Sequence, residues 1–330
     1  MRFDQCCYRC KANLRSLRAA WHEGNSSTTV HHMNGAHGFA EHVAASGHHT
    51  LIFYGDSLFS QVFTWASYEM HQSGARISRV VKGSIPGAFR NFSGSWGDPF
   101  TYHDLAMATF GSRYFRSMRQ YDVALRSGRR LRVINVKIGS LAGKSLSAVL
   151  PCERTANATV LAMLPAAHYN LDDGRASFGD SFGVDVGMWL SWLARCAKAA
   201  RRTTTILAID APAQHWPDGI NGHFAGNTHR QKPRECAINQ SLASSDMPSN
   251  DAKNAIARTT LQTRHATSLP GVLWVPFYNV TRDLGWAHSP YEDGTMDCTH
   301  YCYVPGVIEP LWKELLAGHE RWSREPWKWV

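Results

Sequence analysis

The chain has 330 residues, of which 44% are hydrophobic and 18% charged, so it can bury a full core and is not a disordered protein. Its formal net charge is +9, but the basic residues are spread along the chain, and the densest cluster covers only residues 126–132. We find no motif or basic stripe typical of nucleic-acid binders and therefore predict no nucleic-acid partner. No apolar run reaches the roughly 18 residues that a spanning helix needs, so we predict no transmembrane segment.

The first strong structural signal along the chain lies near residue 50. Residues 1–48 are polar and lack clear periodicity, so we expect a tail or a loosely packed cap there. Residues 50–54 form a short apolar run that predicts a strand, and this run ends at Gly55-Asp56-Ser57. Apolar residues then recur at helical spacing. The segment is therefore predicted to be a strand, a tight turn and a helix.

The later elements follow from the same two periodicities. Residues 74–130 are rich in Gly, Ser and Pro, so we expect mainly loops, with a helix near 112–126. Further strands are predicted at 131–136, 159–164, 204–209 and 272–276, helices at 184–202, 250–269 and 306–319, and a functional loop at 294–305. Strands that alternate with helices predict an α/β fold with a doubly wound, mainly parallel sheet flanked by helices. We place a catalytic domain at residues 49–320 and a Trp-rich tail at 321–330.

Two segments far apart in the sequence carry residue types suited to nucleophilic catalysis. Ser57 follows the first strand and begins a helix, and ligands of parallel sheets sit beyond the carboxyl ends of the strands. The start of a helix also offers N–H groups that suit a developing oxyanion. A serine needs a base, usually a histidine held by a carboxylate, and Asp297 lies three residues before His300. We predict Ser57 as nucleophile, His300 as base and Asp297 as its orienting partner.

These segments resemble motifs of the SGNH (GDSL-like) esterase superfamily. Within it, the chain resembles the plant trichome-birefringence-like polysaccharide O-acetyltransferases of the PC-esterase group. The residues that carry the resemblance are Gly55-Asp56-Ser57, Asp297-Cys298-Thr299-His300-Tyr301-Cys302, Pro305-Gly306-Val307 and the run from Leu311 to Leu316. The resemblance covers about residues 50–317, and it departs from the family where Tyr301 replaces the usual Trp.

The resemblance implies a serine enzyme that forms an acyl-enzyme and passes the acyl (acetyl) group to a polysaccharide hydroxyl. An acyl donor and a carbohydrate acceptor would then be its partners, with no cofactor. Hydrolysis of the same esters, and a non-catalytic carbohydrate-binding relative, stay open as alternatives. Candidates for oxyanion or substrate contacts are Gly55, Asp56, His168 and His215, whereas Pro165 stands where the family has an Asn.

The cysteines allow two readings. Cys298-x-His300-x-Cys302 could bind zinc, but this spacing is short for a zinc site, so we predict no metal. Disulfides of Cys236, Cys298 and Cys302 fit better in an oxidising compartment, although the sequence does not determine the pairing. Eight cysteines and five Asn-x-Ser/Thr sequons favour the secretory pathway, in the Golgi lumen or outside the cell. The start of the chain shows no signal peptide, which favours the cytosol instead.

Overall fold

The computed structural model describes residues 35–84, 88–91, 115–138, 152–166, 178–199, 203–216, 234–236, 250–265, 272–290, 295–302 and 305–324. Its strands are β1 Thr50–Gly55, β2 Arg76–Ser84, β3 Ala88–Asn91, β4 Phe115–Ala124, β5 Arg130–Ile138, β6 Ala158–Met163, β7 Thr205–Ile209, β8 Val272–Val275, β9 His288–Pro290 and β10 Met296–Tyr301. Its helices are α3 Ala36–Ala45, α4 Ser57–Gln72, α6 Phe178–Ala199, α7 Asn250–His265, α8 Tyr278–Thr281 and α9 Pro305–Arg324, with 3-10 helices η3 Cys152–Thr155 and η8 Gly285–Ala287.

Eight of the strands form one mixed sheet in the order β3-β2-β4-β5-β1-β6-β7-β8. The strands from β5 to β8 in this order pair in parallel, and β4, β2 and β3 extend the β5 edge through antiparallel pairs. This arrangement confirms the predicted α/β fold with a mainly parallel sheet. A separate two-stranded sheet pairs β9 with β10 in antiparallel orientation.

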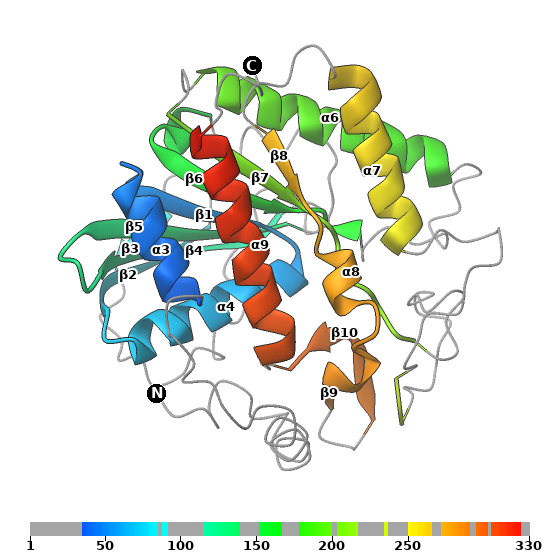
Figure 1. The fold of residues 1–330 in the computed structure, drawn as a ribbon, viewed down its shortest axis with the longest axis horizontal. Coiled ribbons are helices and arrows are strands. Elements are labelled where there is room, and N and C mark those ends of the chain that lie inside the picture. Colours follow the sequence, from blue (N-terminus) through cyan, green and yellow to red (C-terminus); the bar gives the residue numbers. More distant parts are fainter. Residues whose placement is uncertain are drawn as a thin grey trace.

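Helices cover both faces of the main sheet, which confirms the doubly wound arrangement (Figure 1). Side chains of α3, α4 and α9 share one apolar core with the sheet, and those of α6 and α7 share the other. Along β1, Leu51 and Phe53 lie in the first core, whereas Ile52 and Tyr54 lie in the second. Successive side chains of a strand point to opposite faces, so a continuous apolar run is what a strand buried on both sides requires.

The strand order places the turn after β1 at a topological switch point. In chain order the parallel strands are β1, β5, β6, β7 and β8, and the sheet places β5 on one side of β1 and the other three on the opposite side. Ligands of such sheets bind at the carboxyl ends of the strands where the winding direction reverses. Ser57 follows β1 after a single intervening residue, so the predicted nucleophile lies at that edge.

The helix that we predicted near residues 112–126 is wrong, because Phe115–Ala124 form β4. Tyr121 and Val123 are buried in alternation, which is the period of a strand rather than a helix. β4 turns directly into β5, and Gly128 in this turn has a φ of 81°, which glycine adopts without strain. The hairpin with β5 therefore decides the conformation of this segment.

Three further segments differ from their predictions. Residues 1–48 were expected to be a tail or loosely packed cap, yet Ala36–Ala45 form a helix whose Phe39 is 1% exposed in the core. The predicted loop at 294–305 contains β10, which pairs with β9. The last helix extends to Arg324, into the segment that we assigned to a C-terminal tail.

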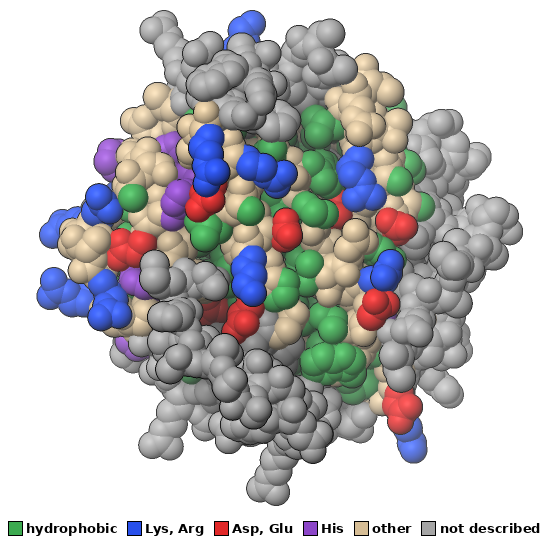
Figure 2. All heavy atoms as spheres, in the orientation of Figure 1, with side chains coloured by type: hydrophobic (Ala, Val, Ile, Leu, Met, Phe, Trp, Pro, Cys, Tyr) green, Lys and Arg blue, Asp and Glu red, His purple; other side chains and the backbone are tan. Residues whose placement is uncertain are grey.

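The surface and the cysteines bear on partners and compartment. Figure 2 shows Lys and Arg side chains interspersed with Asp and Glu on the face drawn, without a continuous basic stripe among the described residues. Disulfides join Cys152 to Cys196 and Cys236 to Cys298, which favours an oxidising environment. Within the described part of the chain, no helix has the length and apolarity needed to cross a membrane.

Candidate active site

The turn between β1 and α4 fixes the position of Ser57. Asp56 is the N-cap of α4, and its Oδ1 accepts a hydrogen bond from Leu58 N at 3.0 Å. A capping carboxylate of this kind satisfies one of the first N–H groups of a helix, which have no partner within the helix itself. Ser57 is the first residue of the helix, so its own N–H belongs to this set of donors. Its side chain and its N–H thus lie together at the positive end of the helix dipole.

His300 reaches this serine from β10, 243 residues later in the chain. Ser57 Oγ and His300 Nε2 are 2.9 Å apart, and His300 Nδ1 and Asp297 Oδ2 are 2.8 Å apart. The second carboxylate oxygen, Asp297 Oδ1, accepts hydrogen bonds from the backbone N–H groups of Thr299 and His300, each at 3.2 Å. The structure therefore brings together the three side chains that the sequence predicted as a triad.

Charge and burial set the protonation states within this chain of hydrogen bonds. Burial by itself raises the pKa of Asp297, but the hydrogen bond and charge of His300, with the backbone N–H groups of His300 and Thr299, outweigh it and leave the pKa below its usual value. The carboxylate is thus ionised and accepts a hydrogen bond from the N–H group at His300 Nδ1. In neutral His300 the Nε2 atom is then free of a proton and can accept the hydroxyl proton of Ser57.

The backbone of β10 around the histidine is held from the β9 side. His288 Nδ1 lies 3.0 Å from His300 O, and the His288 ring stacks on Tyr301 with 4.2 Å between ring centroids. His288 Nε2 in turn lies 2.6 Å from His215 Nδ1, and His215 Nε2 lies 2.8 Å from Arg282 O. Burial lowers the pKa of His288 to about 3 and also lowers the pKa of His215. These contacts hold the segment that carries the candidate base.

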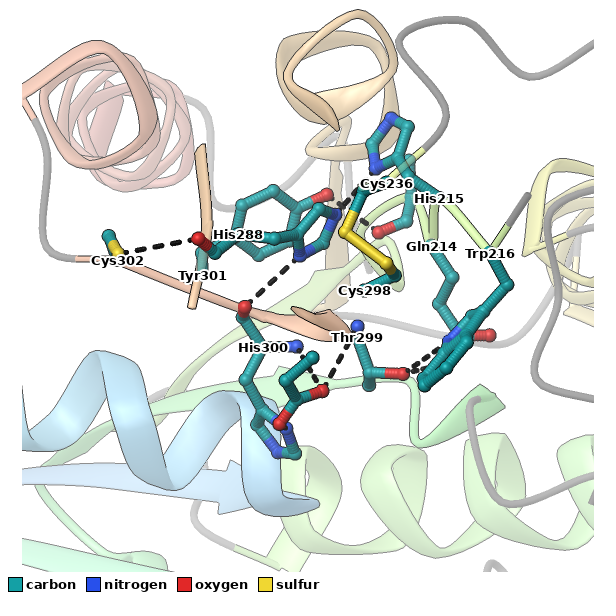
Figure 3. The surroundings of a disulfide bond; sticks show 12 residues. Gln214, His215, Trp216, Cys236, His288, Cys298, Thr299, His300, Tyr301 and Cys302 are labelled. Carbon is teal, nitrogen blue, oxygen red and sulfur yellow. Dashed lines mark hydrogen bonds and ion pairs between the residues drawn. A yellow bond between two sulfur atoms is a disulfide. The ribbon is translucent and has the colours of Figure 1, made fainter. Parts of the chain in front are cut away.

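A second group of side chains surrounds Thr299, on the other side of the same strand (Figure 3). Thr299 Oγ1 accepts hydrogen bonds from Gln214 Nε2 and Trp216 Nε1, both at 2.9 Å. The neighbouring Cys298 is bonded to Cys236, so the strand is also tied covalently to a segment outside it. The candidate base His300 therefore lies between Thr299 and Tyr301, each of which contacts side chains from other segments of the fold.

The other predicted site residues lie in different settings. Asp56 is 1% exposed and caps α4, while Gly55 ends β1 where an added Cβ would lie 2.7 Å from Phe59 Cβ. His215 is fully buried behind β10 and contacts His288 and Arg282 rather than the triad. His168 lies outside the described residues.

The zinc alternative for Cys298, His300 and Cys302 does not fit this arrangement. Both cysteines are disulfide-bonded, and the imidazole of His300 lies between Asp297 and Ser57. A disulfide sulfur has no thiolate to offer a metal. The structure therefore supports the hypothesis that these cysteines form disulfides.

Sequence reasoning missed the residues that support the triad. Gln61 on α4 forms two hydrogen bonds with the backbone of Tyr301, and His288 contacts the backbone of His300. Contacts to backbone atoms leave no chemical pattern in the sequence of the partner. The spacing of Gln61, four residues after Ser57, was the one available signal, because residues at this spacing share a helix face.

No protein-family model matches the chain, and no curated protein sequence matches it either.

Proposed function

We propose that the protein is a serine-dependent acyltransferase that forms an acyl-enzyme at Ser57. The observation that carries this proposal is the hydrogen-bonded chain from Ser57 Oγ through His300 to Asp297, at 2.9 Å and 2.8 Å. A general base that lies 2.6–3.2 Å from the proton-donating atom can remove its proton in the attack step. The position of the serine at a switch point and at a helix start gives further support.

In the first half-reaction, Ser57 Oγ attacks the carbonyl carbon of an acyl ester while its proton moves to His300 Nε2. The Ser57 N–H is suited to donate to the developing oxyanion. Collapse of the tetrahedral intermediate breaks the bond to the leaving-group oxygen, which takes the proton from His300 Nε2. Asp297 stabilises the imidazolium that exists between these transfers and stays ionised throughout. The product of this half-reaction is an ester on Ser57.

In the second half-reaction, a hydroxyl group of the acceptor attacks the serine ester. His300 Nε2 takes the acceptor proton and returns it to Ser57 Oγ as the ester bond breaks. With a sugar hydroxyl the outcome is transfer, and with water it is hydrolysis. The resemblance of the Gly-Asp-Ser and Asp-Cys-x-His-x-Cys segments to polysaccharide O-acetyltransferases supports an acetyl group, a carbohydrate acceptor and a location in the secretory pathway. The disulfides fit the same compartment.

The first experiment asks whether Ser57 is an activated nucleophile. The folded protein is treated with a fluorophosphonate probe, and the labelled residue is identified by peptide mass spectrometry. Label on Ser57 is expected, with none in Ser57→Ala and a rate reduced about 10³-fold or more in His300→Ala. Ser73→Ala is the matched control, because Ser73 lies at the other end of α4 and bonds to Met70 O.

The second experiment identifies the acceptor. The protein is incubated with an acetyl-ester donor, with and without oligosaccharides, and the products are separated by mass spectrometry. Acetylated oligosaccharide is expected, whereas acetate alone would identify an esterase. A folded protein that is never labelled and turns over neither substrate would instead favour a carbohydrate-binding relative and overturn the proposal.

A further inference from the structure

The candidate nucleophile and base belong to different parts of the fold. Ser57 begins α4, which packs on the main sheet, whereas His300 lies in β10 of the separate two-stranded sheet. Tyr301 and Cys302, at the end of this segment, pack in the apolar core that α4 shares with the sheet, but apolar packing has no direction of its own. Directional contacts between α4 and β10 are therefore needed to set the distance between Ser57 Oγ and His300 Nε2.

Gln61 makes such a contact with both polar groups of one peptide residue. Its Oε1 accepts a hydrogen bond from Tyr301 N at 3.2 Å, and its Nε2 donates one to Tyr301 O at 2.5 Å. Tyr301 directly follows His300, and Gln61 lies four residues after Ser57, which is about one helical turn, or roughly 6 Å, along α4. The amide thus joins helix and strand beside the pair that must react.

The edge of β10 that faces away from α4 already makes hydrogen bonds of its own, so Gln61 binds the edge that faces α4. Cys302 N donates to Ala287 O at 2.7 Å, and His300 O lies 3.0 Å from His288 Nδ1. In an extended strand the backbone groups of alternate residues face opposite edges, so those of Tyr301 face α4. Tyr301 is only 2% exposed, and its hydroxyl donates to Ala213 O at 2.6 Å. The strand is therefore held from three directions, and Gln61 supplies the one that faces the serine.

We propose that Gln61 is a positioning residue for the Ser57–His300 pair. Its primary amide holds the backbone of Tyr301 at a fixed place along α4 and so keeps His300 Nε2 within hydrogen-bonding reach of Ser57 Oγ. Gln61 touches neither reacting atom. This inference rests on the proposed function, because it concerns the reactivity of the same serine.

The test compares Gln61→Met, which keeps the length of the side chain and removes both hydrogen bonds, with the wild type. Fluorophosphonate labelling over a range of probe concentrations yields the maximal rate and the half-saturating concentration. The maximal rate is expected to fall about 10- to 100-fold with little change in half-saturation, because a misplacement of about 1 Å is enough for such a loss. The melting temperature should fall by no more than about 5 °C. Thr64→Val on the same helix is the matched control, because the hydroxyl of Thr64 donates to Ser60 O of its own helix.

Gln61→Glu provides a readout that a merely structural role would not change. An ionised carboxylate can accept from Tyr301 N but cannot donate to Tyr301 O, whereas a protonated carboxyl group can do both, as the amide does. The labelling rate of Gln61→Glu relative to wild type at the same pH should therefore rise as the pH falls from about 8 to about 5.5. This comparison also decides the question if Gln61→Met fails to fold.

The outcomes separate the two proposals. If the wild type is not labelled at Ser57, the proposed function itself fails, whatever the variants do. If the wild type is labelled and Gln61→Met reacts at the same maximal rate, the function stands and the positioning role is wrong. A rate of Gln61→Glu that stays at a constant ratio to wild type across the pH range would overturn it in the same way.

Discussion

Two buried histidines at the amino end of the sheet, His48 and His319, predict that the protein loses stability in mild acid. His319 of α9 is fully buried, and its Nε2 lies 3.0 Å from Thr159 Oγ1, which also lies 2.7 Å from His48 Nδ1. The ring of His42 on α3 lies 4.9 Å from that of His319. One hydroxyl can donate to one ring nitrogen and accept from the other, so the arrangement suits neutral rings.

The size of this loss of stability follows from the pKa of His319. Burial, and then the charges of His48 and His42, lower this pKa from 6.5 to about 3, while the unfolded chain keeps the ordinary value. Between these two values only the unfolded state binds the proton, so stability is present above about pH 6.5 and is lost as the pH falls toward 3. Each pH unit below 6.5 is worth about 1.4 kcal/mol, so His319 alone lowers the free energy of unfolding by about 2 kcal/mol at pH 5. His48, with a pKa lowered to about 4, acts in the same direction.

The assay is urea unfolding at pH 7 and pH 5, with the disulfides intact. His319→Gln keeps an amide that can bond to Thr159 but does not titrate. The loss of stability between the two pH values should therefore be about 2 kcal/mol smaller in this variant than in wild type. All other titrating groups are shared by the two proteins, so their contributions cancel. His71→Gln is the control, because His71 is exposed at the end of α4 and should leave the loss unchanged. An equal loss in wild type and His319→Gln would refute the argument.

Four further changes have defined outcomes. Asp297→Asn should slow probe labelling about 10⁴-fold, because an amide no longer fixes the histidine tautomer; labelling within a factor of ten of wild type would contradict the triad. Cys236→Ser opens a disulfide with a sequence separation of 62 and should cost about 2–4 kcal/mol in urea unfolding, together with slower labelling. Gly55→Ala places a Cβ 2.7 Å from Phe59 Cβ in the core and should destabilise the fold by about 1–3 kcal/mol; an unchanged urea midpoint would count against this close packing. Lys253 is 2% exposed, and burial lowers its pKa to about 7, so wild-type stability should rise by about 1.4 kcal/mol per unit from pH 7 to pH 9, whereas Lys253→Met should lack this rise.

The sequence predicted those parts whose pattern is set locally. The five parallel strands are short apolar runs, and burial on both faces makes such runs continuous and easy to recognise. The triad could be predicted for a related reason, because Ser57 and the Asp297–His300 pair consist of residue types that are typical of nucleophilic catalysis. The prediction that these residues meet, although they are 243 residues apart, relied on the expected fold.

The elements that were missed depend on partners distant in sequence or on mixed patterns. In β4, polar residues such as Asp122 alternate with buried ones, and pairing with β5 rather than local propensity makes the segment a strand. In α3, Phe39 and Val43 form an apolar face four residues apart, but the polar Glu41 and His42 between them hide the period. β10 is a strand only through its pairing with β9, and residues 294–305 carry no continuous apolar run that would reveal it.

Because the base comes from outside the main sheet, stability of the fold and alignment of the triad are separate properties of this molecule. The serine is fixed by β1, its N-cap and the core beneath α4, so changes there alter stability and reactivity together. The histidine is fixed through contacts of its own strand, which include the Cys236–Cys298 disulfide, the amide of Gln61, the contact with His288 and the buried side chain of Tyr301. A loosened link of the second kind moves the imidazole while the eight-stranded sheet stays intact. The rate of labelling therefore reports directly on the position of His300 in β10, whereas an unfolding experiment averages over the whole core, in which Tyr301 of β10 is one of many buried side chains.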